Sequence, residues 1–254
     1  MKNFGLIGQT LSHSFSKKFF NEKFLNENID ASYKNFEINT IKEFPNLFKK
    51  DFIINGLNVT IPYKQKVIKF LNELDPISNE IKAVNTILPI YKKGNLMFLK
   101  GYNTDVYGFK QLIKPYLKSN HNKALIFGTG GASKAVSYVL KNYGIDINYV
   151  SRSNKNNFST YSWDQVNENM IKYHELIINT TPIGMYPNDN ELLSIPYQSI
   201  SKNHLLVDLI YNPEETKFLK KGIQQGARCL NGKNMLIHQA LKAWDIWNSE
   251  HSFK

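Results

Sequence analysis

Short apolar runs and amphipathic stretches alternate along most of the chain. The apolar runs predict strands at residues 4–8, 32–38, 83–88, 124–127, 147–150, 176–178, 205–210 and 227–230. Apolar residues recur at helical spacing after residue 16, after Pro62 and over 106–116, 132–140 and 235–244. Strands that alternate with helices predict an α/β protein, and 254 residues suffice for two domains.

The centre of the chain carries a glycine turn between a strand and a helix. Gly128, Thr129, Gly130, Gly131 and Ala132 follow the apolar run 124–127 directly. Glycines there let the backbone turn tightly and approach a pyrophosphate, whose charge suits a helix N-terminus. Gly128 and Gly130 fit the pattern G-x-G-x-x-G, but Ser133 occupies the third position. This context predicts a doubly wound, Rossmann-like dinucleotide-binding domain.

The residues after the next strand indicate which dinucleotide binds. An NAD-binding unit usually places an acidic residue there, on the ribose 2′-hydroxyl. This chain has Ser151, Arg152 and Ser153 instead. A guanidinium and hydroxyls bind a 2′-phosphate, whereas an acid repels it. We therefore expect NADP; the alternative is a solvated arginine in a turn.

The composition of the chain argues against several other classes of protein. We find no apolar run long enough to span a membrane and no signal-peptide pattern. Cys229 is the only cysteine and the six histidines lack ligand spacing, so we expect no disulfide and no metal. The net charge of +11 raises the possibility of nucleic acid, but the lysines are scattered. We expect a cytoplasmic protein with no nucleic-acid or membrane partner.

Several polar residues stand at element ends, where a structural role competes with a functional one. Ser16 is predicted as a helix N-cap, although the hydroxyls at 12–16 can also hold an anion. Lys64 is predicted in the first turn of a helix beginning at Pro62, where the helix dipole disfavours a cation. Asp105 suits a helix start on capping grounds alone.

Eight ordered segments give the chain a resemblance to the shikimate dehydrogenase family over nearly its whole length. They are HSFS at 13–16, NVTIPYK at 58–64, AVNT at 83–86, GYNTD at 101–105, GTGGAS at 128–133, NTTPIGM at 179–185, DLIYNP at 208–213 and NGKNMLIHQA at 231–240. The resemblance implies reversible NADPH-dependent reduction of 3-dehydroshikimate to shikimate in aromatic amino-acid biosynthesis. It also implies a substrate domain at 1–102 plus 236–254, and an NADP domain at 103–235.

The resemblance further implies roles for individual residues. Lys64 and Asp105 match the family's catalytic pair. The positions that match its substrate-binding residues are Ser14, Ser16, Asn58, Thr60, Asn85, Tyr211 and Gln239. The positions that match its cofactor-binding residues are Gly128 to Ala132, Ser151, Arg152, Ser153, Leu209 and Gly232. The expected partners are a small-molecule substrate and NADP, in a monomer or a homodimer.

The chain departs from the family pattern in two places. Lys17 stands where proline is common, and Ser151-Arg152-Ser153 replaces the Asn-Arg-Thr common in NADP-selective members. Because the arginine is kept, NADP preference is still expected. The alternatives are an NAD-linked quinate/shikimate dehydrogenase and a non-catalytic nucleotide-sensing homologue. The presence of both Lys64 and Asp105 argues against the second.

Overall fold

Two compact units make up the chain in the computed structural model, which describes residues 1–11, 14–49, 53–152 and 159–249. The first unit comprises Met1–Tyr107 and Leu236–Lys254, and the second comprises Gly108–Met235. This division falls after Tyr107, whereas the sequence placed it after residue 102. Asn103 and Thr104 hydrogen bond to Ala83 and Asn85, and these bonds tie the intervening segment to the first unit.

The first unit contains a mixed six-stranded sheet in the order β2-β1-β3-β5-β6-β4. Its strands are β1 (Lys2–Gly8), β2 (Ala31–Glu37), β3 (Gly56–Val59), β4 (Glu73–Leu74), β5 (Thr86–Lys92) and β6 (Asn95–Tyr102). Strand β1 pairs in parallel with β2 and β3, while β5 pairs antiparallel with β3 and β6. The register of β3 and β5 places Asn58 opposite Thr86.

The helical segments of this unit differ from the prediction in two places. They are α1 (Phe15–Asn26), η1 (Ile41–Lys49), η2 (Lys66–Phe70), α2 (Pro76–Ile81) and most of α7 (Lys233–Ser249). Ser14 rather than Ser16 caps α1, since the Ser14 side chain accepts from the Lys17 amide. No helix begins at Pro62: residues 61–65 form turns, and only the short 3-10 helix η2 follows.

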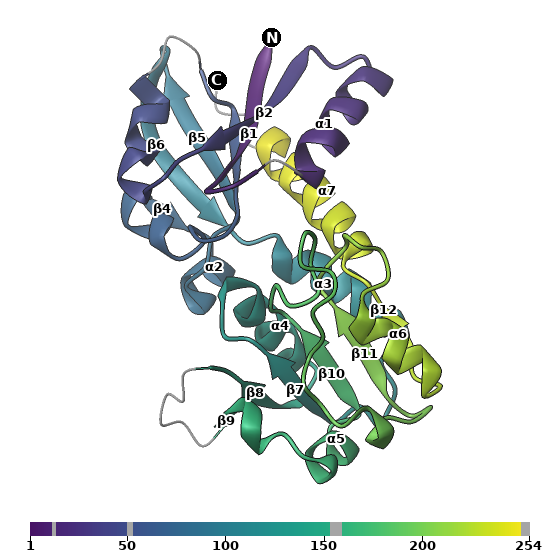
Figure 1. Cartoon of the computed structure of the whole chain (residues 1–254). Coiled ribbons are helices and arrows are strands. Elements are labelled where there is room, and N and C mark those ends of the chain that lie inside the picture. The colour runs from purple at the N-terminus through teal and green to yellow at the C-terminus, as the bar shows by residue number, and fades with distance from the viewer. Residues whose placement is uncertain (12–13, 50–52, 153–158, 250–254) are drawn as a thin grey trace. The chain divides into compact units, whose positions relative to one another are not determined.

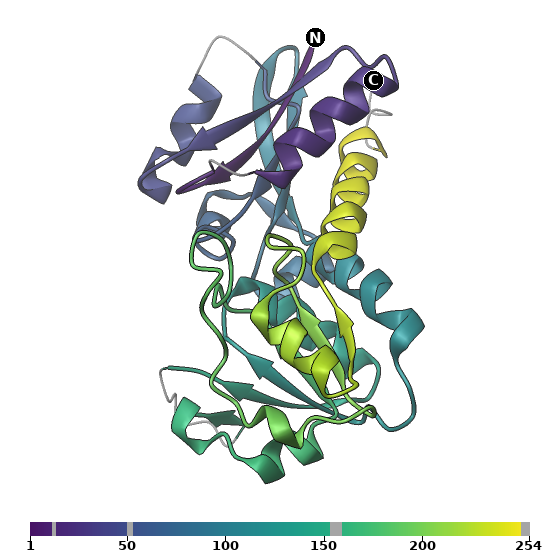
Figure 2. The ribbon, with the colours of Figure 1, turned by 45° about the vertical axis from the view of Figure 1, so that its right-hand side comes forward.

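One core of the first unit lies between the sheet and the helices α1 and α7, which lie side by side (Figures 1 and 2). Its centre is Trp247, which is 1% exposed and stacks on Phe4 at 4.9 Å. The Trp247 indole donates to the Ile87 carbonyl at 3.1 Å. Gly56 allows this approach, because a Cβ there would lie 2.5 Å from the indole. A second core, built around Ile7, Leu57 and Val67, includes residues of η1 and η2.

The second unit contains a six-stranded parallel sheet in the order β12-β11-β10-β7-β8-β9. Its strands are β7 (Lys123–Phe127), β8 (Asp146–Val150), β9 (Thr160–Tyr161), β10 (Leu176–Asn179), β11 (Leu205–Asp208) and β12 (Arg228–Leu230). The order reverses beside β7, as in doubly wound dinucleotide-binding sheets. The predicted Rossmann-like class is therefore confirmed (Figure 1).

Helices complete the second unit around strands that are buried on both faces. The helical segments are α3 (Asp105–Ile113, which begins in the first unit), η3 (Lys114–Tyr116), α4 (Gly131–Asn142), η4 (Trp163–Gln165), α5 (Glu168–Tyr173), η5 (Tyr197–Ser199) and α6 (Lys217–Gln224). Leu125 and Phe127 pack into the core that contains Phe218 of α6, while the alternate residue Ile126 is equally buried. This two-sided burial explains why β7 reads as a continuous apolar run.

Candidate functional site

An ion pair between Lys64 and Asp105 forms the centre of the candidate site in the first unit. Lys64 Nζ donates to Asp105 Oδ2 at 2.6 Å, and the two side chains are 16% and 2% exposed. Lys64 lies in the turn before η2, where its carbonyl accepts from Val84 at 2.8 Å. Asp105 is the first residue of α3, whose start is fixed by the Asn103 side chain accepting from the Val106 amide. Segments 41 residues apart in sequence thus bring an ammonium and a carboxylate together.

Asn85 connects this pair to its surroundings. Its amide nitrogen lies 2.9 Å from Asp105 Oδ1, 3.0 Å from Thr104 Oγ1 and 3.0 Å from Gln239 Oε1. Its oxygen accepts from the Thr104 amide at 2.7 Å. Asn85 is 3% exposed, and these bonds give its polar atoms protein partners. Its predicted contact with the substrate stays a prediction; the structure shows that it holds Asp105 and Gln239.

The contact with Asn85 also orients Gln239. Because the Gln239 side-chain oxygen accepts from Asn85, its side-chain nitrogen is left to donate elsewhere. Gln239 lies on α7 and is half-buried. The first unit therefore presents a lysine ammonium and a glutamine amide, both of which are hydrogen-bond donors, beside the same buried aspartate.

Asn58 extends the polar network toward the start of α1. Its side-chain nitrogen donates to the Asn85 carbonyl at 3.2 Å and to Thr86 Oγ1 at 3.1 Å. Its oxygen accepts from the Tyr33 hydroxyl at 2.7 Å. Both Asn58 protons are thereby used, so only its oxygen can serve a further partner.

Tyr33 is a member of this network that the sequence analysis missed. Burial raises the pKa of Tyr33 well above its ordinary value, and a hydrogen bond from Ser16 opposes that shift. Through Tyr33, the predicted substrate residue Ser16 connects to Asn58, Asn85 and the Lys64–Asp105 pair. Tyr33 reads as a core residue of strand 32–38 by its spacing, which gives no sign of its hydroxyl partners.

Ser14 and Thr60, two further predicted substrate residues, also belong to the first unit. Ser14 uses its oxygen as an acceptor for the Lys17 amide at 3.1 Å, so its hydroxyl proton is not used by that bond. Thr60 follows β3, and its backbone is held by Ile7 at 2.9 Å. Both side chains are half-buried. Tyr211, the remaining predicted substrate residue, is a half-buried residue of the second unit, in the segment after β11.

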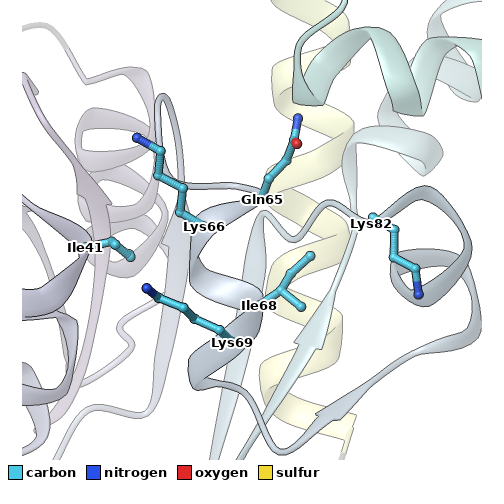
Figure 3. A pocket seen from close by; sticks show the side chains of 6 residues that line it. All are labelled: Ile41, Gln65, Lys66, Ile68, Lys69 and Lys82. Atoms are coloured by element: carbon cyan, nitrogen blue, oxygen red, sulfur yellow. The ribbon is translucent and has the colours of Figure 1, made fainter.

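A surface hollow of about 540 Å³ on the first unit does not contain the ion pair. Its lining residues are Ile41, Gln65, Lys66, Ile68, Lys69 and Lys82 (Figure 3). A second hollow of about 530 Å³ includes Ser14 among its lining residues. We place the candidate site by the polar network rather than by the first hollow, because Lys64 and Asp105 are absent from its lining.

The glycine turn of the second unit has the geometry that its sequence predicts. Gly128 has φ +105°, and a Cβ there would lie 2.6 Å from Thr180 Oγ1. Gly130 precedes α4 without any side-chain cap, and a Cβ there would meet no atom within 4 Å. The first amides of a helix have no intrahelical acceptor, so the start of α4 offers donors to an anion. Ser133, at the position of the third glycine, donates instead to the Gly130 carbonyl at 2.7 Å.

One of the predicted 2′-phosphate residues, Ser151, lies beside this turn. Ser151 Oγ is 3.5 Å from Thr129 Oγ1, so the end of β8 adjoins the glycine turn. Arg152 is exposed and, among the described residues, makes no hydrogen bond or ion pair. Ser153 lies outside the described residues.

Leu209 and Gly232, from distant parts of the sequence, touch in the second unit. The Gly232 amide donates to the Ile210 carbonyl at 3.0 Å. A Cβ on Gly232 would lie 2.6 Å from the Leu209 carbonyl carbon, so only glycine fits there without displacement of the backbone. Cys229, predicted to be a packing residue, contacts the apolar core of this unit.

The described part of the chain lacks two features of other protein classes. Within residues 1–11, 14–49, 53–152 and 159–249, no three histidine, cysteine, aspartate or glutamate side chains form a group that could hold a metal ion. Over those same ranges, every helix is too short or too polar to cross a membrane.

The doubly wound sheet with its glycine turn, joined to a unit that carries a Lys–Asp pair, defines the class of two-domain α/β dinucleotide-binding proteins. Residues 6–87 match the family model of the shikimate dehydrogenase substrate binding domain. The shikimate dehydrogenase (NADP(+)) of Clostridium beijerinckii is 40% identical, over 97% of this chain and 92% of that protein.

Two crystal structures extend the comparison. Shikimate dehydrogenase 1 from Peptoclostridium difficile has a TM-score of 0.82 and 37% identity, over 98% of this chain and 92% of that one. The Thermus thermophilus shikimate 5-dehydrogenase, in complex with NADP(H) and shikimate, has a TM-score of 0.83 and 25% identity, over 98% of this chain and 94% of that one. The chain belongs to the shikimate dehydrogenase family.

Proposed function

We propose that the protein is an NADP-dependent shikimate dehydrogenase, which reversibly reduces 3-dehydroshikimate to shikimate in aromatic amino-acid biosynthesis. The observation that carries the proposal is the Lys64 ammonium held at 2.6 Å by the buried Asp105 carboxylate. Reduction of a ketone needs a group that delivers a proton to the oxygen or stabilises its developing charge. A fixed ammonium serves either purpose.

Lys64 and Asp105 have distinct roles in this proposal. An ammonium has three N–H donors, and the bond to Asp105 uses one of them. The remaining donors supply the proton to the substrate oxygen or stabilise the alkoxide. Asp105 orients the ammonium and is itself held by Asn85 at 2.9 Å, so the pair is pre-organised before substrate binds.

The polar residues around the pair suit a small, hydroxylated carboxylate. Ser14 and Ser16 bind the carboxylate, and Thr60, Gln239 and Tyr211 contact the ring hydroxyls. Asn58 contributes as an acceptor, because its donors are already used. Asn85 acts mainly by holding Gln239 and Asp105 in place.

The second unit fits NADP, which would supply a hydride in its reduced form and accept one in its oxidised form. Residues 128–132 surround the pyrophosphate, and two features support this: Gly130 leaves open space, and the start of α4 lacks a side-chain cap. Ser151, Arg152 and Ser153 bind the 2′-phosphate. Leu209 and Gly232 lie beside the nicotinamide.

The first experiment compares four substrate pairs. The purified protein is mixed with shikimate or quinate, and with NADP⁺ or NAD⁺, and reduced nicotinamide is followed by absorbance. We expect fast turnover with shikimate and NADP⁺ only. Comparable rates with NAD⁺ or quinate would instead favour the broader quinate/shikimate dehydrogenase. Tight cofactor binding without turnover would favour the non-catalytic sensor.

Separate measurements test the proposed binding partners and oligomeric state. A cytoplasmic protein without nucleic-acid or membrane partners, acting as a monomer or a homodimer, stays a prediction. Sedimentation at several protein concentrations measures the oligomeric state. Retention of oligonucleotides at low and high salt tests the nucleic-acid alternative that the net charge of +11 raises.

A further inference from the structure

Three polar side chains of the second unit are buried almost completely and have no part in the proposed chemistry. Asn179 and Asp208 are 0% exposed, and Thr216 is 1% exposed. Asn179 ends β10 and Asp208 ends β11, and the two are paired in the sheet. Thr216 is the N-cap of α6. Asn179 and Asp208 therefore lie where the loops after two neighbouring parallel strands begin, the edge at which such sheets bind ligands, and Thr216 lies where the second loop ends.

Asp208 is the centre of this cluster. Its Oδ2 accepts from the Thr216 hydroxyl at 2.7 Å, and its Oδ1 accepts from Asn179 Nδ2 at 3.1 Å and the Ile210 amide at 3.0 Å. Burial raises the pKa of Asp208 to about 7, and these three hydrogen bonds oppose the shift. A fully buried carboxylate is costly unless such donors surround it.

Asn179 connects Asp208 to the loop after β10 by hydrogen bonds. Its oxygen accepts from the Thr181 amide at 2.9 Å and the Thr181 hydroxyl at 2.7 Å. Its nitrogen donates to the Ile183 carbonyl at 3.2 Å, in addition to its bond with Asp208. The side chain that holds Asp208 therefore also shapes residues 181–183.

Ile210 connects Asp208 to the loop after β11 by hydrogen bonds. The Ile210 amide is held by Asp208, and the Ile210 carbonyl accepts from the Gly232 amide at 3.0 Å. The neighbouring Leu209 backbone contacts Gly232 so closely that no side chain fits. The position of Leu209 against Gly232 thus depends on a chain of bonds that begins at the Asp208 carboxylate.

We propose that Asp208 is a positioning residue for the cofactor, one that locks the loops 180–186 and 209–213 together and seats Leu209 against Gly232. This rests on the proposed function, since that function places the nicotinamide beside Leu209 and Gly232. Asp208 acts through other residues and does not touch the cofactor. Both loops are also joined by the Tyr186 amide, which donates to the Asn212 carbonyl at 3.1 Å.

The test is Asp208→Asn, studied at a pH above 7, where the wild-type carboxyl is ionised. The amide has the same shape but carries no negative charge. Its NH₂ group must face either the two donors Asn179 and Ile210 or the Thr216 hydroxyl, which would then have to reverse and accept. The dissociation constant of NADP⁺, measured by calorimetry without substrate, should rise by about 10- to 100-fold, the factor that corresponds to a hydrogen bond to a charged group. Hydrogen exchange at the Ile210 and Gly232 amides should accelerate, while exchange in β7 stays unchanged.

Two kinds of control accompany this variant. Ile171→Val removes a methyl group from a buried residue of α5 and should lower the unfolding temperature without changing NADP⁺ affinity. Thr216→Ser keeps the hydroxyl and should behave as the wild type, whereas Thr216→Val should reproduce the Asp208→Asn effect. If Asp208→Asn does not fold, the two Thr216 variants decide the question.

Unchanged NADP⁺ affinity and unchanged exchange in Asp208→Asn, or in Thr216→Val where the first does not fold, would overturn the inference. These readouts need no turnover, so they separate it from the proposed function. A wild type that binds NADP⁺ but does not oxidise shikimate, with affinity lost in Asp208→Asn, would refute the function and leave the positioning role intact.

Discussion

Removing the Lys64 side chain perturbs the candidate site in two ways that can be measured separately. Lys64→Ala removes the only cation bonded to Asp105 among the described residues. Loss of a general acid costs about 10² to 10⁴ in rate. Turnover should fall by that factor, which corresponds to about 2.7–5.5 kcal/mol of activation free energy. Substrate affinity should change less, because Gln239 and the serines remain.

The same substitution should also destabilise the fold. Asp105 is 2% exposed in its side chain and, of its side-chain donors in the described part of the chain, would keep Asn85 alone. Breaking a buried ion pair by removing one partner costs about 3–5 kcal/mol, because a buried charge is left uncompensated. Adding Asp105→Asn removes that charge. The double variant should regain most of the lost stability, measured by urea unfolding, while its turnover stays low.

Steady-state kinetics with shikimate and NADP⁺, together with urea titrations, provide the assay. A large rise in KM with turnover intact would refute the catalytic role and make Lys64 a binding residue. A Lys64→Ala variant as stable as the wild type would refute the electrostatic reasoning, since the Asp105 carboxylate would then not need its partner.

Three further predictions concern the second unit. Arg152→Ala should raise the KM for NADP⁺ roughly tenfold or more and leave that for NAD⁺ nearly unchanged; equal effects on both would show that Arg152 does not read the 2′-phosphate. Gly232→Ala should cost about 1–3 kcal/mol in urea unfolding, because its Cβ meets the Leu209 backbone. Gly130→Ala should not lower the free energy of unfolding in this way, because its Cβ meets nothing within 4 Å. Similar losses of stability in the two variants would contradict the packing argument. The pKa of Asp208 is raised from 3.8 to about 7 in the folded protein. Between these values only the unfolded chain is ionised there, so relative to Asp208→Asn the wild type should lose up to about 4 kcal/mol of stability as pH rises toward 7. A pH-independent difference would show that Asp208 titrates normally.

The local pattern of apolar residues and glycines predicted the strand, turn and helix at the centre of the second unit correctly. The apolar run before Gly128, the glycine turn and the helical spacing after it are each determined within a few residues, and all three are confirmed. Gly144 has φ +72° just after α4, a conformation that favours glycine at a helix end. In such segments the local preference of the chain and the tertiary packing agree.

The sequence pattern gave a wrong prediction where contacts between distant residues determine the structure. Pro62 and the apolar residues after it suggested a helix, yet Leu74 pairs in β4 and the segment before η2 is turned. The argument that the helix dipole disfavours Lys64 therefore does not apply. The buried cluster around Asp208 escaped notice because its partners lie 29 and 8 positions away. In the sequence, each of these residues has the features of an ordinary strand end or helix cap.

The position of Trp247 has a consequence for how the protein is made. The first unit is interrupted in sequence by the whole second unit, and Trp247 lies at the centre of its core. During translation, nearly all of the segment Gly108–Met235 emerges before α7 (Lys233–Ser249) and can fold as a unit ahead of it. The aromatic face formed by Phe4, Phe20 and Tyr33 must wait for Trp247 until the second unit has been synthesised. Until then this apolar face lacks its partner, and docking of α7 completes the core of the first unit.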